Sequence, residues 1–166
     1  MKVVPFWLDL QFAGFADEAT PFSPVEGITL GWFDGKGLCV SKFGFGGCSE
    51  DLMFAEAAKS LGKLQSVNAI PVGWDLRRLV WPAFVNGCLR NSVSLPQKFV
   101  MRPETKWNNL DMVDLQGLMC QGGYSPDWRP TIHEAKAFFR IEPGTPDINA
   151  MFLIYKRYVE LEFPNA

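Results

Sequence analysis

The sequence predicts an α/β domain in which a mixed sheet is flanked by helices. An apolar, strand-like segment lies near the start of the chain, and two further strand candidates joined by a tight turn follow it. A fourth short apolar segment then lies between stretches with helical periodicity, and the last third of the chain carries helix-capping signals. At 166 residues the chain is expected to form one domain that spans residues 1–166.

Composition and charge narrow the classes of function. Hydrophobic residues make up 48% of the chain, which is enough for a packed core. No apolar run reaches the roughly 18 residues that span a bilayer, and Pro5 and Asp9 break the N-terminal run, so we expect a cytoplasmic protein without membrane contact. The net charge of −2 argues against nucleic-acid binding through bulk positive charge. Four cysteines without zinc-site spacing are expected to be buried free thiols rather than disulfides: Cys39, Cys48, Cys88 and Cys120.

The first predicted strand, residues 6–14, carries two polar side chains. Residues two apart on a strand share a face, so Asp9 and Gln11 project together while Leu8 and Leu10 face the other way. A carboxylate in an apolar strand is unfavourable unless it is paired, hydrogen-bonded or bound to a metal ion, or reaches water at the end of the strand. The strand alone leaves both interpretations open.

Two strands and a helix are expected next. Residues 28–33 and 38–43 are strand candidates, and the Asp34-Gly35 dipeptide between them is typical of a hairpin turn, which predicts a three-strand meander. A helix is predicted from Glu50 to Gly62, with a buried face formed by one set of apolar residues. These are Leu52, Ala55, Ala58 and Leu61.

The remaining elements are mainly helical. Residues 69–74 predict a short strand, in which Pro71 indicates an edge or an irregularity. Helices are then expected over residues 75–91, interrupted near Pro82, and over residues 110–119. Thr131 and Glu134 have the capping-box spacing of a helix through Phe139, and a last helix begins with Pro146 at its first position. Its expected buried stripe is Ile148, Met151, Phe152 and Tyr155.

Three stretches carry a resemblance to a known family. They are residues 7–14 (WLDLQFAG), 72–82 (VGWDLRRLVWP) and 147–157 (DINAMFLIYKR). In this order they resemble the three motifs of the DnaQ-like (DEDD) 3′–5′ exonucleases, in the branch related to the proofreading exonuclease of family-B DNA polymerases. The resemblance implies a ribonuclease-H-like fold.

The resemblance also implies a metal site with departures from the family pattern. In such enzymes four carboxylates hold two divalent ions for phosphodiester hydrolysis. The resemblance puts Asp9 and Asp147 at two of these positions, as ligands of Mg²⁺ or Mn²⁺. Gln11 replaces a Glu, and Val80 replaces an Asp, so one position keeps only an uncharged oxygen and the other keeps no ligand. Asp75, in place of the usual Asn, is either a substitute ligand or an ordinary helix N-cap.

Two functions therefore remain open. The first is a 3′–5′ exonuclease-like nucleic-acid-processing domain with an incomplete two-metal site, whose hydrolysis is weak or lost. The alternative is a non-catalytic pseudo-nuclease that serves as a nucleic-acid-binding or protein-binding accessory subunit. Arg77, Arg78 and Trp74 are the candidate contacts to single-stranded DNA or RNA, although such arginines also occur on solvated helix faces and such tryptophans in cores. His133, the single histidine, is a distant candidate for a catalytic base.

Overall fold

The computed structural model describes residues 3–14, 18–64, 67–96, 99, 112–120 and 129–162. Its sheet consists of β1 (Val3–Phe12), β2 (Val25–Phe33), β3 (Leu38–Phe43), β4 (Asn68–Gly73) and β5 (Val113–Asp114). Its helices are α1 (Glu50–Gly62), the π-helix η2 (Leu76–Val80), α2 (Trp81–Arg90), α3 (Leu115–Met119), α4 (Ile132–Phe138) and α5 (Asp147–Glu162).

The five strands form one mixed sheet in the order β3-β2-β1-β4-β5. Strand β1 pairs antiparallel with β2 and parallel with β4, and β2 pairs antiparallel with β3. The predicted three-strand meander and the predicted mixed sheet are therefore confirmed. Strand β1 has a hydrogen-bonded neighbour on each side, so its two faces are the only directions in which its side chains can point.

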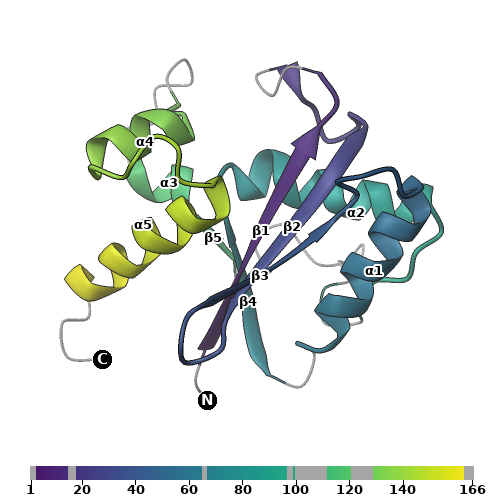
Figure 1. The fold of residues 1–166 in the computed structure, drawn as a ribbon, viewed down its shortest axis with the longest axis horizontal. Helices are drawn as coiled ribbons and strands as arrows, with labels where there is room; N and C mark the ends of the chain where they lie inside the picture. The colour runs from purple at the N-terminus through teal and green to yellow at the C-terminus, as the bar shows by residue number, and fades with distance from the viewer. Residues whose placement is uncertain are drawn as a thin grey trace.

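Helices cover both faces of the sheet, with α1 and α2 on one side of β1 and α3, α4 and α5 on the other (Figure 1). Phe6, Leu8 and Leu10 of β1 belong to the hydrophobic cluster formed with α1, η2 and α2. Trp7 belongs to the second cluster, which includes Ile148 and other residues of α5. The alternation of β1 side chains between two apolar layers is the one that the sequence predicts.

Local signals in the sequence fix several turns and helix ends. The Asp34 carboxylate accepts hydrogen bonds from the backbone N–H groups of Lys36 and Gly37, at 2.8 and 2.9 Å, and this closes the hairpin between β2 and β3. The capping box of α4 is also present, because Thr131 and Glu134 each accept a hydrogen bond from the other's backbone N–H. Both predictions are confirmed.

The predicted helix over residues 110–119 was wrong in its first part. Val113 and Asp114 form strand β5 beside β4, and α3 begins only at Leu115. The Asp114 carboxylate accepts from the backbone N–H groups of Gln116 and Gly117, so Asp114 is the N-cap of α3 and ends the strand. A two-residue strand carries too little periodicity to be recognised in a sequence.

The buried face of α1 also differs from the prediction. Leu52 is 57% exposed, whereas Met53 and Phe54 are buried. The residues that pack inward from Phe54 onward are Phe54, Ala57, Ala58 and Leu61, which have the i, i+3, i+4, i+7 spacing of one helical face. The expected set began two positions too early and shares only Ala58 and Leu61 with this face.

The stretch after β4 is helical but irregular. Asp75 has a positive φ of 49°, η2 follows it, and α2 begins at Trp81 with Pro82 in its first turn. The irregularity thus precedes the proline rather than coinciding with it, and Pro82 stands where a helix tolerates proline. Pro71 pairs with Phe6 of β1, and β5 reaches only Val72 and Gly73, so Pro71 lies in the part of β4 that has no described neighbour on its β5 side, which is where a strand tolerates proline.

Helix α5 begins one residue later than expected, at Asp147. Ile148 and Met151 are buried as predicted, and Ala150 and Ile154 are buried with them. Phe152 and Tyr155 are partly buried, and their rings meet the Trp7 indole edge to face, with centroids 5.2 and 5.7 Å away. These contacts hold α5 against the middle of the sheet.

All four cysteines are free, as predicted, but only Cys88 and Cys120 are buried; Cys39 is half-buried and Cys48 is exposed, so the expected burial was wrong for these two. Among the residues that the structure describes, no helix combines the length and the apolar character needed to cross a membrane.

Gly87 of α2 lies against the Phe54 ring of α1 and provides a test of this packing. A Cβ at Gly87 would lie 2.0 Å from the fully buried Phe54 ring, whereas a Cβ at Gly144 would meet open space. We expect overpacking in Gly87→Ala to destabilise the fold by about 1–3 kcal/mol. The higher helix propensity of alanine offsets up to about 1 kcal/mol of this loss. Gly144→Ala is the matched control and should change stability by less than about 0.5 kcal/mol. Urea unfolding measures both, and equal stability of the two variants would contradict the packing described.

Candidate functional site

The site begins with the polar face of β1. Asp9 and Gln11 share a face with Trp7, and therefore point toward the layer that contains α5. Asp9 is half-buried, whereas Gln11 is exposed at the end of the strand, next to a shift in the β1–β2 register. The predicted projection of the two side chains to one face is thus what the structure has.

Asp147 enters the site from the helical layer that Asp9 faces. It is the first residue of α5, where a carboxylate is favoured by the unpaired N–H groups and the dipole of the helix. Its side chain is 41% exposed. The charge of Asp147 acts on Asp9, so the fold brings together two residues that are far apart in the sequence and that the family resemblance predicts as metal ligands.

Lys136 is the third charged residue of the site, and sequence reasoning missed it. Its side chain is only 5% exposed, and its Nζ donates to Asp147 Oδ1 at 2.6 Å. In the sequence, Lys136 stands between Ala135 and Ala137 in a short predicted helix, eleven residues before Asp147. Nothing in that pattern distinguishes a buried lysine from a solvated one, because lysines are mostly exposed.

The protonation of Asp9 reflects this environment. The pKa of Asp9 is raised from its ordinary value of 3.8 to about 7, first by burial of the carboxyl group and second by the negative charge of Asp147. A backbone hydrogen bond at Leu10 and the positive charge of Lys136 act in the opposite direction but do not cancel the first two causes. Asp9 therefore exchanges its proton near neutral pH.

Asp75 belongs to a different cluster of charges. Its carboxylate accepts from Nε and Nη2 of Arg78, the first at 3.0 Å, and Arg129 Nη1 lies 3.8 Å away. Burial raises the pKa of Asp75, Arg78 and Arg129 oppose this, and the acidic group that acts on it is Asp114. Because its partners are arginines, the Asp75 side chain is held as an ion pair rather than as a hydrogen-bonded helix cap.

The predicted nucleic-acid contacts have partners within the chain. Arg77 Nη2 donates to the Met112 carbonyl at 3.0 Å, and Arg78 is paired with Asp75, although both arginines are exposed as residues. Trp74 is half-buried against the cluster of α5. The roles of Arg77, Arg78 and Trp74 in nucleic-acid binding stay predictions.

Val80 and His133, the other candidate residues, do not add a ligand to the pair formed by Asp9 and Asp147. Val80 is buried in the apolar cluster with Phe6 and Leu8 and supplies no ligand. His133 is exposed on α4. Among the residues that the structure describes, no group of three or more His, Cys, Asp and Glu side chains could hold a metal ion. The donors present, two carboxylates beside an ammonium group, do not fit a two-ion site.

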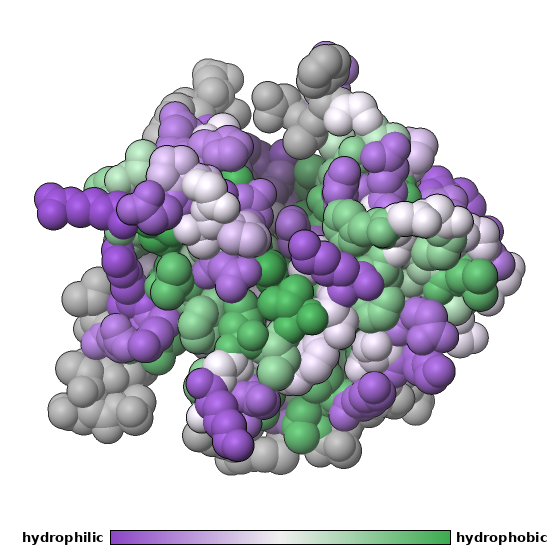
Figure 2. Space-filling view, viewed as in Figure 1, coloured by the Kyte–Doolittle hydropathy of each residue, from purple (hydrophilic) through white to green (hydrophobic). Residues whose placement is uncertain are grey.

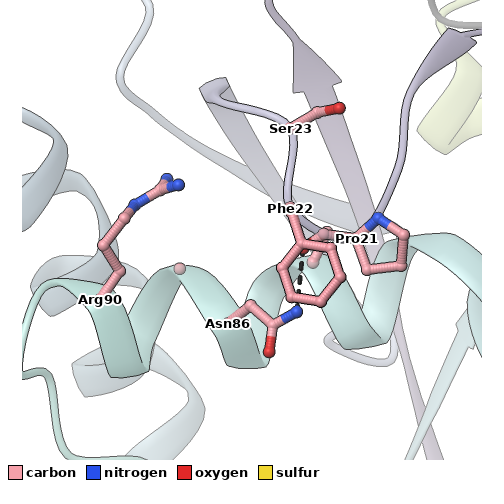
Figure 3. Close-up of a pocket in the computed structure, with 7 residues that line it drawn as sticks. Pro21, Phe22, Ser23, Asn86 and Arg90 are labelled. Carbon is pink, nitrogen blue, oxygen red and sulfur yellow. Dashed lines mark hydrogen bonds between the residues drawn. The ribbon is translucent and has the colours of Figure 1, made fainter.

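A pocket lies elsewhere on the molecule. It has a volume of about 260 Å³ and is formed between α2 and the turn before β2 (Figure 3). Asn86 Nδ2 donates to the Pro21 carbonyl at 3.0 Å across it, and Phe22 and Arg90 contribute to its wall. None of Asp9, Asp147 and Lys136 lines this pocket, so it is separate from the acidic site.

Comparison with known proteins identifies the fold. No protein-family model matches the chain, and no curated protein matches its sequence. A product-bound structure of exonuclease I matches with a TM-score of 0.67 and 13% identity, over 97% of this chain and 44% of that one. E. coli exonuclease I in complex with a dA16 oligonucleotide matches with a TM-score of 0.68 and 13% identity, over 98% of this chain and 42% of that one. The zinc-bound form of the E. coli exonuclease I complex with single-stranded DNA gives a TM-score of 0.65 and 14% identity, over 98% and 42% of the two chains.

These likenesses confirm the predicted ribonuclease-H-like α/β fold. At 13–14% identity they concern the fold alone. The chain spans less than half the length of the exonuclease I chains that it matches.

The raised pKa of Asp9 predicts how stability depends on pH. Between pH 3.8 and about 7 the folded state keeps a proton on Asp9 that the unfolded state releases, so this residue's contribution to stability falls as the pH rises. The slope is at most about 1.4 kcal/mol per pH unit and disappears above pH 7. Asp9→Asn removes the titrating carboxyl group and with it this pH dependence. The stability of Asp9→Asn relative to wild type should therefore increase from pH 4 to pH 7 and then level off.

Urea unfolding at pH 4 to 8 measures this difference. Glu56→Gln is the control, because Glu56 is exposed and pairs only with exposed Lys59 in the salt bridge found there. A difference between Asp9→Asn and wild type that stays constant over this range would show that Asp9 is already ionised in the folded protein at pH 4.

Proposed function

We propose that this chain is a nucleic-acid-processing domain of the 3′–5′ exonuclease type, which binds single-stranded DNA or RNA and whose phosphodiester hydrolysis is weak or lost. The observation that carries the proposal is an exposed aromatic ring paired with a lysine on the sheet face of Asp9 and Gln11. An aromatic surface beside a positive charge is the arrangement with which proteins hold single strands, because bases stack on the ring and phosphates meet the cation.

The aromatic ring is that of Phe45. A Cβ at Gly27 would lie 2.5 Å from the ring, so Phe45 lies directly over Gly27, which is the partner of Gln11 in the β1–β2 ladder. Directly paired residues share a face, and the ring therefore covers the sheet next to Gln11. Phe45 is nevertheless 50% exposed.

The positive charge is that of Lys42. Its Nζ lies 5.6 Å from the centre of the Phe45 ring, within the range of a cation–π contact. Lys42 pairs with Thr29 on β2, and Thr29 pairs with Asp9 on β1, so all three side chains are on one face. A base on Phe45 would have its phosphate near Lys42 and its neighbour near Asp9.

We infer weak or absent hydrolysis from the oxygen ligands that the site offers to metal ions. Mg²⁺ and Mn²⁺ bind hard oxygen ligands, and a two-metal mechanism needs both ions in place. Gln11 offers an uncharged oxygen, and Asp75 is held by arginines. Loss of even a supporting group around a metal lowers activity by about 10 to 100-fold, and here charged ligands themselves are missing.

The exonuclease I structures support the nucleic-acid part of the proposal. Two of them hold a dA16 and a 5cy-dA13 oligonucleotide, and they share the fold of this chain. The closer kinship to the proofreading domain of family-B polymerases, the choice between DNA and RNA, and the catalytic roles of Asp9, Gln11, Asp75 and Asp147 remain predictions.

A second candidate function is a protein-binding accessory domain. Apolar side chains are exposed beside α5, where Phe33 is 46% exposed and stacks on Phe152, and Val40 and Leu153 are each 38% exposed. Figure 2 shows hydrophobic side chains gathered on this face of the molecule. Such surfaces commonly mark protein contacts. Retained binding of single strands by a Phe33→Ser variant would separate the two functions.

Binding to single strands tests the proposal directly. Phe45→Ala should weaken binding of a 5′-labelled oligonucleotide by about 1–3 kcal/mol, since one stacked base is lost. Phe22→Ala is the matched control, because Phe22 is 77% exposed but lies at the pocket beside α2. Fluorescence anisotropy with DNA and RNA measures both. Equal affinity of the two variants, or no binding by wild type, would contradict the proposal.

Cleavage is tested with the same oligonucleotides. With Mg²⁺ or Mn²⁺, shortening from the 3′ end should be absent, or within about tenfold of the Asp9→Ala background, because the site lacks ligands for two ions. The product ladder on a denaturing gel is the measurement. Rapid shortening that disappears in Asp9→Ala would show that hydrolysis is fully retained.

A further inference from the structure

The buried ammonium group of Lys136 is the least expected feature of the site. Lysine is seldom buried, since removing its charge from water is unfavourable unless an opposite charge compensates. Lys136 is 4% exposed, and its charge is compensated by Asp147 at 2.6 Å. The ion pair with Asp147 is therefore what allows the Lys136 ammonium group to be buried.

The backbone holds Lys136 in place from both ends of α4. The capping box fixes the start of the helix, and the backbone N–H of Ile141 donates to the Lys136 carbonyl at 2.8 Å just after its end. Arg157 of α5 donates to the Phe139 carbonyl and so joins the two helices. Neighbouring Ala135 is fully buried in the cluster of α5. The ammonium group therefore reaches the site from a fixed helix rather than from a loop.

The charge of Lys136 acts on both acidic residues. It forms the ion pair with Asp147, and its positive charge also acts on Asp9. Two carboxylates and one ammonium group give the site a formal charge of −1. A single divalent ion between the same two carboxylates would bring the formal charge to zero, so Lys136 supplies half of that compensation, from a cation that is covalently part of the chain.

We propose that the ammonium group of Lys136 is the fixed cation of this site, in the place that a divalent metal ion would take between Asp9 and Asp147, and that it keeps such ions out. It occupies an Asp147 oxygen that a metal would need, and it repels a second cation. Asp9 and Asp147 are thus held in one site without any metal. The inference concerns the cation alone and does not rest on nucleic-acid binding.

Metal binding to variants of the full chain tests this inference. Lys136→Met keeps most of the side-chain volume and removes the charge, and Lys136→Glu adds a third carboxylate beside Asp9 and Asp147. Lys156→Met is the matched control, since Lys156 is 60% exposed on α5 and pairs with Glu160. Mn²⁺ is the probe, and the loss of the free-ion signal in electron paramagnetic resonance measures its binding. Circular dichroism shows that each variant is folded.

Wild type and Lys156→Met should show no specific Mn²⁺ site. Lys136→Met should bind Mn²⁺ at least about tenfold more tightly than wild type, because one supporting charge changes metal affinity by about 10 to 100-fold, and Lys136→Glu should bind more tightly still. Mn²⁺ should also raise the thermal stability of both Lys136 variants and not that of wild type.

Two results would overturn the inference. One is folded Lys136 variants that bind Mn²⁺ no better than wild type. The other needs no Lys136 variant: specific Mn²⁺ binding by wild type that is lost in Asp9→Asn would show that Lys136 does not exclude the ion. Oligonucleotide binding by wild type is measured separately, with and without EDTA, and this measurement tests the proposed function rather than the role of Lys136. Failure to bind any oligonucleotide would count against that function and leave the Mn²⁺ result to decide on Lys136.

Discussion

Strand β1 is the element on which the other parts of the molecule depend. It is hydrogen-bonded to β2 on one side and to β4 on the other, so its side chains can point only into the two helical layers. Leu8 and Leu10 enter one apolar cluster, and Trp7 enters the other. A shift of one residue in register would exchange the two faces and bury Asp9 against α1 and α2. The apolar face therefore fixes where Asp9 and Gln11 are presented.

A carboxylate placed on a half-buried sheet face requires a compensating cation. At Asp9 and Asp147 this cation is Lys136 from α4, and at Asp75 it is Arg78, with Arg129 nearby. The two groups of charges are separate, because the acid that acts on Asp9 is Asp147 whereas the acid that acts on Asp75 is Asp114. Each of these groups of carboxylates has a cation of the chain beside it, although the pKa of Asp9 and that of Asp75 are still raised by burial.

The sequence predicted those features that depend on local periodicity and capping. The hairpin at Asp34, the capping box of α4 and the face shared by Asp9 and Gln11 all follow from neighbouring residues. Strand β5 was missed because two residues carry no period, and the buried face of α1 was misplaced because Leu52 and Phe54 are equally apolar in the sequence. Tertiary packing alone decides which of these is covered.

The same distinction applies to the site. Motif resemblance predicted Asp9 and Asp147, since each stands at a recognisable place on a strand or helix. It could not predict Lys136, because the meaning of a lysine depends on what surrounds it in space, and here the partner is eleven residues away in another helix. Phe45 was missed for a similar reason. Its ring lies on the sheet face next to Gln11 only because Gly27, which has no side chain, leaves room for it.

The packing of this fold and the charges of the acidic site depend on different residues. The packing of β1 against α5 depends on Trp7, Phe152 and Tyr155, which contain no metal-binding group. Under the proposed role of Lys136, the cation beside the start of α5 comes from α4, and these apolar contacts do not depend on it. The proposed stacking of a base on Phe45 beside Lys42 likewise requires no metal ion.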